Sequence, residues 1–205
     1  MKGSSSSKTR GLLIILSGPS GVGKGTVRRL VMADKSLNLH YSISMTTREP
    51  RNREADGVDY FFVSKEEFEE HIKNNDFLEY ASFVNNYYGT PKHYVDSLLE
   101  EGKNVFLEIE VQGAMKAMKL YHGVGVTSIF LVPPSLEELE ARIRHRRSEA
   151  DEIIQERLNK ARGEMGMKYH YDYCVLNDSV QRAADEIKTI IKSSLKKLKN
   201  KSCEK

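Results

Sequence analysis

The stretch Gly18-Pro19-Ser20-Gly21-Val22-Gly23-Lys24-Gly25-Thr26 decides the fold of this 205-residue chain. Five apolar residues, Leu12 to Leu16, precede it, and a segment with helical periodicity, Thr26 to Ala33, follows it. A strand, a glycine-rich turn and a helix in this order form the context of a phosphate-binding loop. Glycine lets the backbone turn tightly and come close to a ligand. The loop N–H groups and the positive helix N-terminus then face an anion, and Lys24 can reach the β- and γ-phosphates of a nucleotide.

The alternative is a glycine-rich turn that only joins a strand to a helix. The spacing of the glycines, Lys24 and the flanking elements all favour the phosphate-binding loop instead. The residue after Lys24 is Gly25, so the hydroxyl that is the candidate metal ligand comes one place later, at Thr26. This GKGT ending resembles nucleoside monophosphate kinases more than motor ATPases or small GTPases.

The composition is typical of a soluble globular domain. The chain is 39% hydrophobic and 30% charged, which is sufficient for a core, and it contains no apolar run near the roughly 18 residues of a membrane span. A net charge of +3 does not argue for a nucleic-acid partner. Cys174 and Cys203 have neither metal-binding nor redox spacing, so we expect a cytoplasmic protein. Residues 1–10 are Ser-rich and basic without an apolar block, and we expect a disordered tail rather than a secretory signal.

Strands and helices alternate along the chain. The predicted strands are 12–16, 39–45, 57–63, 77–84, 105–109, 126–132 and 172–176, and the predicted helices are 26–33, 65–74, 92–101, 111–121, a helix from 136, 151–167 and 179–198. This order predicts an α/β fold with a mostly parallel sheet and a ligand at the carboxyl ends of its strands. The block of about 41–93 has strands at hairpin spacing, with a turn at 87–91, and predicts a small mixed sheet inserted into the larger fold. A Lys-rich tail, 196–205, follows the last helix.

A loop with two arginines follows the second predicted strand. In Thr46-Thr47-Arg48-Glu49-Pro50-Arg51, Pro50 disfavours a helix, so Arg48 and Arg51 can converge on an anion from an extended loop. Two solvated arginines are the alternative at this point, because most charged side chains are simply exposed. Further arginines, at 142, 144, 146 and 147, gather at the end of the helix that begins near 136.

Five stretches in a fixed order resemble the guanylate kinase family, from about Gly11 to Leu195. They are GPSGVGKGT at 18–26, TTREPR at 46–51, DYFFVS at 59–64, NYYGT at 86–90 and EIEVQG at 108–113. The resemblance implies transfer of the γ-phosphate of ATP to GMP, with Mg²⁺ as the metal, and we expect dGMP to be accepted as well. It also implies a P-loop NTPase core, a GMP-binding insert at about 41–93 and a mobile helical lid at about 142–165.

The resemblance also assigns residues to the two substrates. It assigns the GMP phosphate to Arg48, Arg51, Tyr60 and Tyr88, and guanine to Ser44, Glu79 and Thr90. Glu108 and Glu110 match positions near the metal and the acceptor, where related enzymes often carry aspartates. Arg146 and Arg157 match phosphate-contacting arginines of the lid, and Asn177 matches a position near adenine.

The chemistry that the resemblance implies explains these residue types. A phosphate monoester has a second pKa of about 6, so the acceptor is already an anion at neutral pH and needs no general base. The six histidines form no site by their spacing. Cations must instead offset repulsion between the two substrates and align them. Lys24, Arg48, Arg146 and Arg157 are therefore the candidate catalytic residues.

Two other interpretations of the sequence stay open. Guanylate-kinase-like domains of scaffold proteins bind peptides and transfer no phosphate, and other monophosphate kinases accept AMP, UMP or CMP. The intact phosphate loop argues against the first, and the acceptor stretches argue against the second. The expected partners are ATP and GMP, with a monomer or a homodimer as the assembly.

Overall fold

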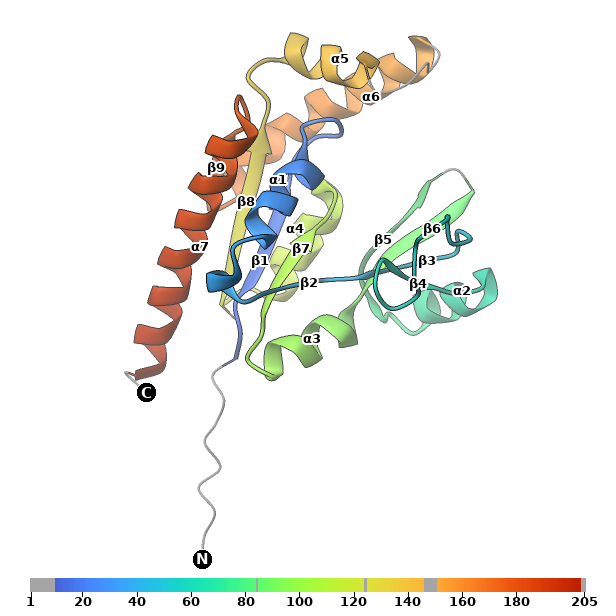
Figure 1. Cartoon of the computed structure of the whole chain (residues 1–205). Coiled ribbons are helices and arrows are strands. Elements are labelled where there is room, and N and C mark those ends of the chain that lie inside the picture. Colours follow the sequence, from blue (N-terminus) through green and yellow to red (C-terminus); the bar gives the residue numbers. More distant parts are fainter. Residues whose placement is uncertain (1–9, 84, 124, 146–150, 204–205) are drawn as a thin grey trace, which may run out of the picture.

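Two β-sheets organise the chain (Figure 1). The structure, a computed structural model, describes residues 10–83, 85–123, 125–145 and 151–203. The first sheet has five strands, all parallel, in the order β2 (Leu39–Tyr41), β7 (Asn104–Glu108), β1 (Leu13–Ser17), β8 (Val126–Val132) and β9 (Tyr173–Leu176). The predicted α/β class with a mostly parallel sheet is confirmed.

The central strand of this sheet leads directly into the glycine-rich stretch. After β1 the chain passes through the loop and enters α1 (Lys24–Met32), which starts two residues earlier than predicted. Gly18 has φ +145°, and a Cβ there would lie 2.4 Å from the carbonyl oxygen of Leu131. Only glycine avoids that clash, which explains why the loop must open with this residue.

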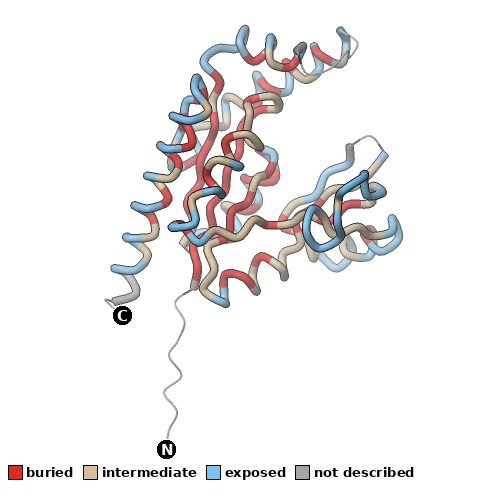
Figure 2. Tube along the Cα trace, viewed as in Figure 1, coloured by how far each residue is buried: buried red, intermediate tan, exposed pale blue. Residues whose placement is uncertain are grey.

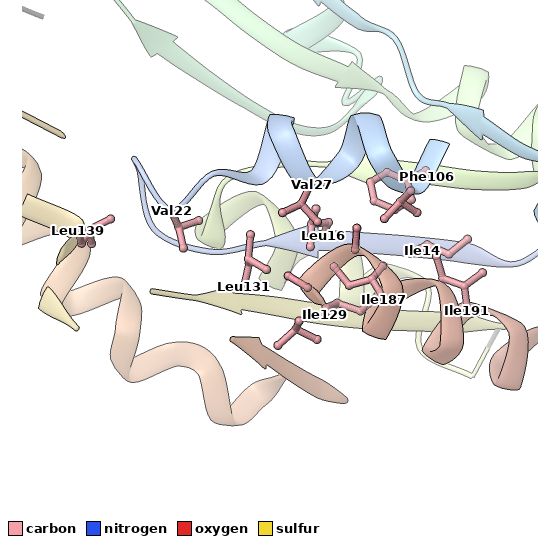
Figure 3. Packing of buried hydrophobic residues seen from close by; sticks show 14 of the residues in the cluster. Ile14, Leu16, Val22, Val27, Phe106, Ile129, Leu131, Leu139, Ile187 and Ile191 are labelled. Carbon is pink, nitrogen blue, oxygen red and sulfur yellow. The ribbon is translucent and has the colours of Figure 1, made fainter. Parts of the chain in front are cut away.

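Helices cover both faces of the five-stranded sheet. Side chains of β1 alternate between the faces: Ile14 and Leu16 belong to one buried cluster, and Leu13 and Ile15 to the other. The first cluster joins the strands to α1 and to α7 (Val180–Cys203), as Figure 3 shows. The second joins them to α3 (Lys92–Glu100) and α4 (Val111–Leu120). Burial on both faces explains the uninterrupted apolar run at the start of the chain.

The second sheet lies beside the first and has four strands. Its order is β4 (Tyr60–Phe62), β3 (Ser44–Thr46), β6 (Asn86–Pro91) and β5 (Phe77–Phe83), with a parallel β3–β4 pair and antiparallel β3–β6 and β5–β6 pairs. Helix α2 (Lys65–Lys73) packs on it through buried Phe68, which stacks on Phe77 and Tyr87. The predicted cap of this helix forms, because the Glu67 N–H donates to Ser64 Oγ at 3.1 Å. Figure 2 shows less buried chain here than in the first sheet.

Two of the predicted elements were wrong. Residues 39–45 do not form one strand: β2 belongs to the first sheet and β3 to the second, and the chain crosses between the sheets at this point. Residues 87–91 are not a turn but belong to β6, which pairs with β3 on one side and β5 on the other. Gly89 suggested a turn, yet a Cβ there would lie 2.8 Å from Phe77 Cδ1 and 3.0 Å from Phe68 Cζ, so this glycine serves close packing.

The remaining helices complete the chain. They are α5 (Leu136–His145), α6 (Asp151–Met165) and the short helices η1 (Lys35–Leu37) and η2 (Gly166–His170). Helices α5 and α6 lie together beyond the phosphate-loop end of the first sheet (Figure 1). The predicted lid arginine Arg146 and its neighbour Arg147 lie outside the described residues.

Both ends of the folded region differ from expectation. Most of the predicted N-terminal tail lies outside the described residues, but Arg10 pairs with Asp96 at 3.2 Å. Helix α7 does not end near Leu198; it continues through the Lys-rich segment to Cys203, because that segment lacks Gly and Pro and lysine is a good helix former. Across the described ranges, the helices are all too short or too polar to span a bilayer.

Candidate functional site

Three strands of the first sheet end at the same edge and bring the candidate residues together. The loop of residues 18–26 follows β1, Glu108 closes β7, and Asn177 follows β9. Parallel strands place their carboxyl ends on one side of a sheet, so residues far apart in sequence meet there.

Lys24 occupies the centre of this edge. Its ammonium donates to the carbonyl oxygens of Gly18 at 2.6 Å and Pro19 at 3.2 Å. Burial lowers its pKa, and the nearby carboxylates of Glu108 and Glu164 oppose that change. A partly desolvated cation in this position attracts a phosphate more strongly than an exposed lysine would.

One side of the phosphate loop is held by residues from the end of the chain and from α5. Asn177 is buried, and its Nδ2 donates to the carbonyl of Val22 at 2.7 Å. Arg142 donates from Nη2 to the carbonyl of Asn177 at 3.1 Å. These residues, with Thr26 and Gly23, line a cavity of about 540 Å³. The Asn177 Nδ2 holds the loop, while its Oδ1 is buried without a hydrogen-bond partner within the described part of the chain.

Helix α6 approaches the loop from another side. Arg157 donates from Nη2 to Ser20 Oγ at 3.0 Å. Glu164 is only 7% exposed, and burial raises the pKa of its carboxyl group. Glu164 lines a cavity of about 280 Å³ together with Lys24, Gly25, Glu108 and Glu110. Glu110 is more exposed and pairs with Lys160 at 2.8 Å.

A larger cavity, of about 740 Å³, lies between α1 and the second sheet. From the second-sheet side it is lined by Ser44, Tyr60 and Tyr88, three of the predicted acceptor-site residues. Glu108 lines both this cavity and the smaller one beside Lys24. The two cavities therefore share one lining residue.

Arg48 lies beside the two tyrosines. Its guanidinium carbon is 5.5 Å from the centroid of the Tyr60 ring, and the Tyr60 and Tyr88 rings meet edge-on at 6.1 Å. Hydrogen bonding from Arg48 to Glu54 raises the pKa of the arginine, so its positive charge is secure. Arg51, in contrast, is exposed, and its backbone N–H rather than its side chain makes the contact with Glu54.

Glu79 and Thr90 form a separate pair on β5 and β6. Thr90 is fully buried, and its Oγ1 donates to Glu79 Oε1 at 2.6 Å. Burial raises the pKa of Glu79, and the Thr90 hydrogen bond partly opposes that change. Gly113 of α4 packs directly against Glu79: a Cβ at Gly113 would lie 2.6 Å from Glu79 Cγ. This pair does not line the 740 Å³ cavity, in contrast to Ser44, Tyr60 and Tyr88.

The oxygen donors near Lys24 fit a magnesium ion bound largely through phosphate. Mg²⁺ commonly uses one or two carboxylates, phosphate oxygens and water, not a cage of protein ligands. No cluster of three or more Asp, Glu, His or Cys suited to a metal occurs among the residues described. Glu108, which lines the cavity of Lys24, offers one such carboxylate, and its Oε2 also lies 3.3 Å from Arg28 Nε. Thr26, the predicted ligand, lines the cavity on the Asn177 side instead.

Several residues of the site were not singled out from the sequence. Glu54, Arg28 and Tyr41 line the 740 Å³ cavity, and Arg28 stacks on Tyr41 with its guanidinium carbon 4.2 Å from the ring centroid. Glu164 and Arg142 contribute from α6 and α5. The sequence signal for Glu54 is its closeness to Arg48 and Arg51, and that for Arg142 is the group of arginines at the end of its helix. Glu164, Arg28 and Tyr41 carry no signal without the fold.

Comparison with known proteins agrees with this geometry. The family model described as guanylate kinase matches residues 10–194. The guanylate kinase of Oceanobacillus iheyensis is 57% identical over 187 residues, 91% of this chain and 89% of that protein. The guanylate kinase of Bacillus subtilis is 52% identical over 185 residues, 90% of this chain and 89% of its own length.

A solved structure agrees as well. The crystal structure of guanylate kinase from Anaplasma phagocytophilum superposes with a TM-score of 0.70 at 34% identity, over 91% of this chain and 87% of that one. These matches cover nine-tenths of the sequence, and the glycine-rich loop at the end of β1 agrees with them: the chain belongs to the guanylate kinase family.

Proposed function

We propose that this guanylate kinase transfers the γ-phosphate of ATP to GMP by holding the two nucleotides in adjoining cavities. ATP-dependent phosphorylation of GMP, giving ADP and GDP, is the reaction of the family. In our proposal, ATP extends from the cavity of Asn177, Arg142 and Thr26 to the phosphate loop, and GMP occupies the cavity of Ser44, Tyr60 and Tyr88. Use of dGMP is part of the proposal.

The observation that carries this proposal is the position of Glu108. Its carboxylate lines both the acceptor cavity and the cavity of Lys24, so a GMP phosphate and a γ-phosphate bound in them would meet beside it. The cavity of Lys24 in turn shares Gly21 and Gly23 with that of Asn177. Neighbouring cavities in this series therefore share lining residues near the ends of β1 and β7.

Charge neutralisation is the main task of the protein side chains. The GMP phosphate is already anionic near neutral pH, because its second pKa is about 6. Repulsion between the substrates is then the obstacle, and fixed cations that face the transferring group reduce it. We assign this role to Lys24 at the phosphate loop, to Arg48 and Arg51 at the acceptor, and to Arg157 and Arg146 on the lid side.

We assign guanine recognition to Glu79 and Thr90. Guanine carries two adjacent donors, N1–H and the N2 amino group, whereas adenine has an acceptor at N1. An ionised carboxylate accepts from both guanine donors, and Thr90 orients it through the 2.6 Å hydrogen bond. A site built to pair such groups can reject the wrong substrate by about 10⁴-fold, because mispaired buried groups lose water without compensation.

We propose Mg²⁺ as the metal, and Thr26, Glu108 and Glu110 are the residues that would hold it together with phosphate oxygens. When bound it would supply positive charge between the two phosphates. We place the protein in the cytoplasm because its cysteines lack disulfide or metal spacing. A monomer or homodimer remains our proposal for its assembly.

A coupled assay for ADP release tests the function directly. GMP, dGMP, AMP, UMP and CMP are supplied in turn with ATP and Mg²⁺. We expect turnover with GMP and dGMP, and at least 100-fold lower kcat/KM with the other three. Preference for another monophosphate would refute the guanine assignment, and absence of turnover with all five would favour a peptide-binding module.

A further inference from the structure

The Glu54 carboxylate bridges two arginines, Arg48 and Arg51, in the loop between β3 and β4. Both oxygens of Glu54 accept from Arg48 Nη2, at 3.0 and 2.8 Å. Oε2 also accepts from the backbone N–H of Arg51 at 2.8 Å. The Arg51 N–H, and then the Arg48 side chain, hold the pKa of Glu54 below its ordinary value, so the carboxylate is ionised at neutral pH.

The backbone completes the closure. The Glu54 N–H donates to the carbonyl of Arg51 at 3.0 Å, so residues 51–54 form a turn whose ends bond each other twice. Arg53 has φ +77° at the third position of this turn, where glycine is usual. Arg53 has a β-carbon, so this conformation is unfavourable for it, and the turn that it forms places Glu54 beside Arg48.

Hydrogen bonds to Glu54, Glu49 and Tyr88 leave part of the Arg48 guanidinium for a ligand. A guanidinium has five N–H donors, and Glu54 engages only those of Nη2. Nη1 donates to the carbonyl of Glu49 at 2.6 Å, while the rings of Tyr60 and Phe62 lie 5.5 and 5.8 Å from the guanidinium carbon. The side chain is thus fixed in position beside the acceptor cavity, which Glu54 itself helps to line.

We propose that Glu54 is a positioning residue for the acceptor phosphate, which acts by holding Arg48 and the Arg51 backbone in the orientation that binds it. The inference rests on the proposed role of Arg48 in binding the GMP phosphate. A long arginine side chain loses considerable rotamer freedom when it binds, and a preformed orientation removes much of that cost.

Charge repulsion alone and a positioning role predict opposite effects of neutralising Glu54 on phosphate binding, so an experiment can distinguish them. A negative charge close to an anion site repels the anion, so neutralising Glu54 should by itself strengthen phosphate binding. Positioning gives the reverse result. In Glu54→Gln the amide NH₂ would face an N–H donor of Arg48 or Arg51, so part of the network is lost while the side-chain shape is kept.

The experiment compares Glu54→Gln with Glu49→Gln, which makes the same charge change at an exposed position of the same loop. KM and kcat for GMP and ATP are measured, together with the calorimetric affinities for GMP and for guanosine. We expect Glu54→Gln to raise KM and Kd for GMP about 10-fold, since small misplacement of a binding group can cost up to about 100-fold. The guanosine affinity, the ATP KM and the melting temperature should stay near wild type, and Glu49→Gln should behave as wild type throughout.

A double-mutant cycle with Arg48→Ala separates positioning from an independent role. If Glu54 acts through Arg48, adding Glu54→Gln to Arg48→Ala should change GMP affinity less than twofold. Additive losses, tighter GMP binding by Glu54→Gln, or equal losses for GMP and guanosine would each overturn the inference. Failure of the wild-type protein to bind GMP would instead refute the proposed function, and so the two failures are distinguishable.

Discussion

Gly113→Ala should damage the acceptor site without unfolding the protein. Gly113 lies in α4, and a Cβ there would lie 2.6 Å from Glu79 Cγ, 2.9 Å from Glu79 Cβ and 3.0 Å from Glu79 Oε2. Carbon atoms in contact prefer about 3.5–4.0 Å, so Glu79 must shift by roughly 1 Å. The shift would pull the carboxylate away from Thr90, whose hydrogen bond to it is 2.6 Å long.

Gly113→Ala should change the stability of the protein little and its activity strongly. Alanine is favoured over glycine inside a helix by about 1 kcal/mol, and overpacking a core costs about 1–3 kcal/mol. These effects largely offset each other, so we expect a melting temperature within a few degrees of wild type. A 1 Å misplacement of a binding group can cost about 100-fold, so kcat/KM for GMP should fall 10- to 100-fold and the preference for GMP over AMP should narrow.

The control is Gly163→Ala, the same change in α6. A Cβ at Gly163 would have no atom within 4 Å, so this variant should gain helix stability and keep its GMP kinetics. Steady-state kinetics with GMP and AMP, together with thermal unfolding, measure both variants. If Gly113→Ala kept wild-type kcat/KM for GMP, Glu79 would not be the residue that recognises guanine.

Lys24→Met should lower kcat at least about 100-fold with little change in melting temperature, because it removes a cation at the transferring phosphate; a loss below about 10-fold in single-turnover assays would exclude the phosphate-loop role. Because burial raises the pKa of Glu79 above 4.5, kcat/KM for GMP should fall as the pH drops through that raised pKa, and Glu79→Gln should lack this acid limb; identical pH profiles for the two proteins would contradict an ionised Glu79. Arg53→Gly should stabilise the fold by about 0.5–1 kcal/mol in urea unfolding, since glycine adopts φ +77° without strain; a lower urea midpoint would contradict the strain. Closure of the regions of about 41–93 and 142–165 over the substrates should reduce hydrogen exchange in both when a bisubstrate analogue binds; unchanged exchange would refute moving parts.

Local pattern was sufficient for most of the first sheet. The apolar run before Gly18 predicted β1, and the boundaries of β8 were predicted without error. Residues 64–67 predicted the start of α2, and the cap forms as expected. These features depend on neighbours within a few residues, where glycine spacing, capping and periodicity act directly.

Local pattern failed where an element is defined by distant partners. Residues 39–45 look like one strand, but β2 pairs with β7 and β3 pairs with β4 and β6, so the chain leaves one sheet for the other. Gly89 looks like a turn residue, but it lies in β6 because Phe68 and Phe77 leave no room for a side chain. Neither pairing nor crowding of this kind is visible in a short window of sequence.

The sequence by itself determined the phosphate-binding loop, the α/β class and the family, because these follow from residue types at fixed spacing. Only the tertiary structure decided how the residues act together. It placed Gly113 against Glu79, turned Glu54 back onto Arg48, tied Asn177 to Val22 and put Glu108 between two cavities. The physical reason is that such contacts depend on the register and separation of packed elements, to within about an ångström, and residue identity alone does not fix those distances.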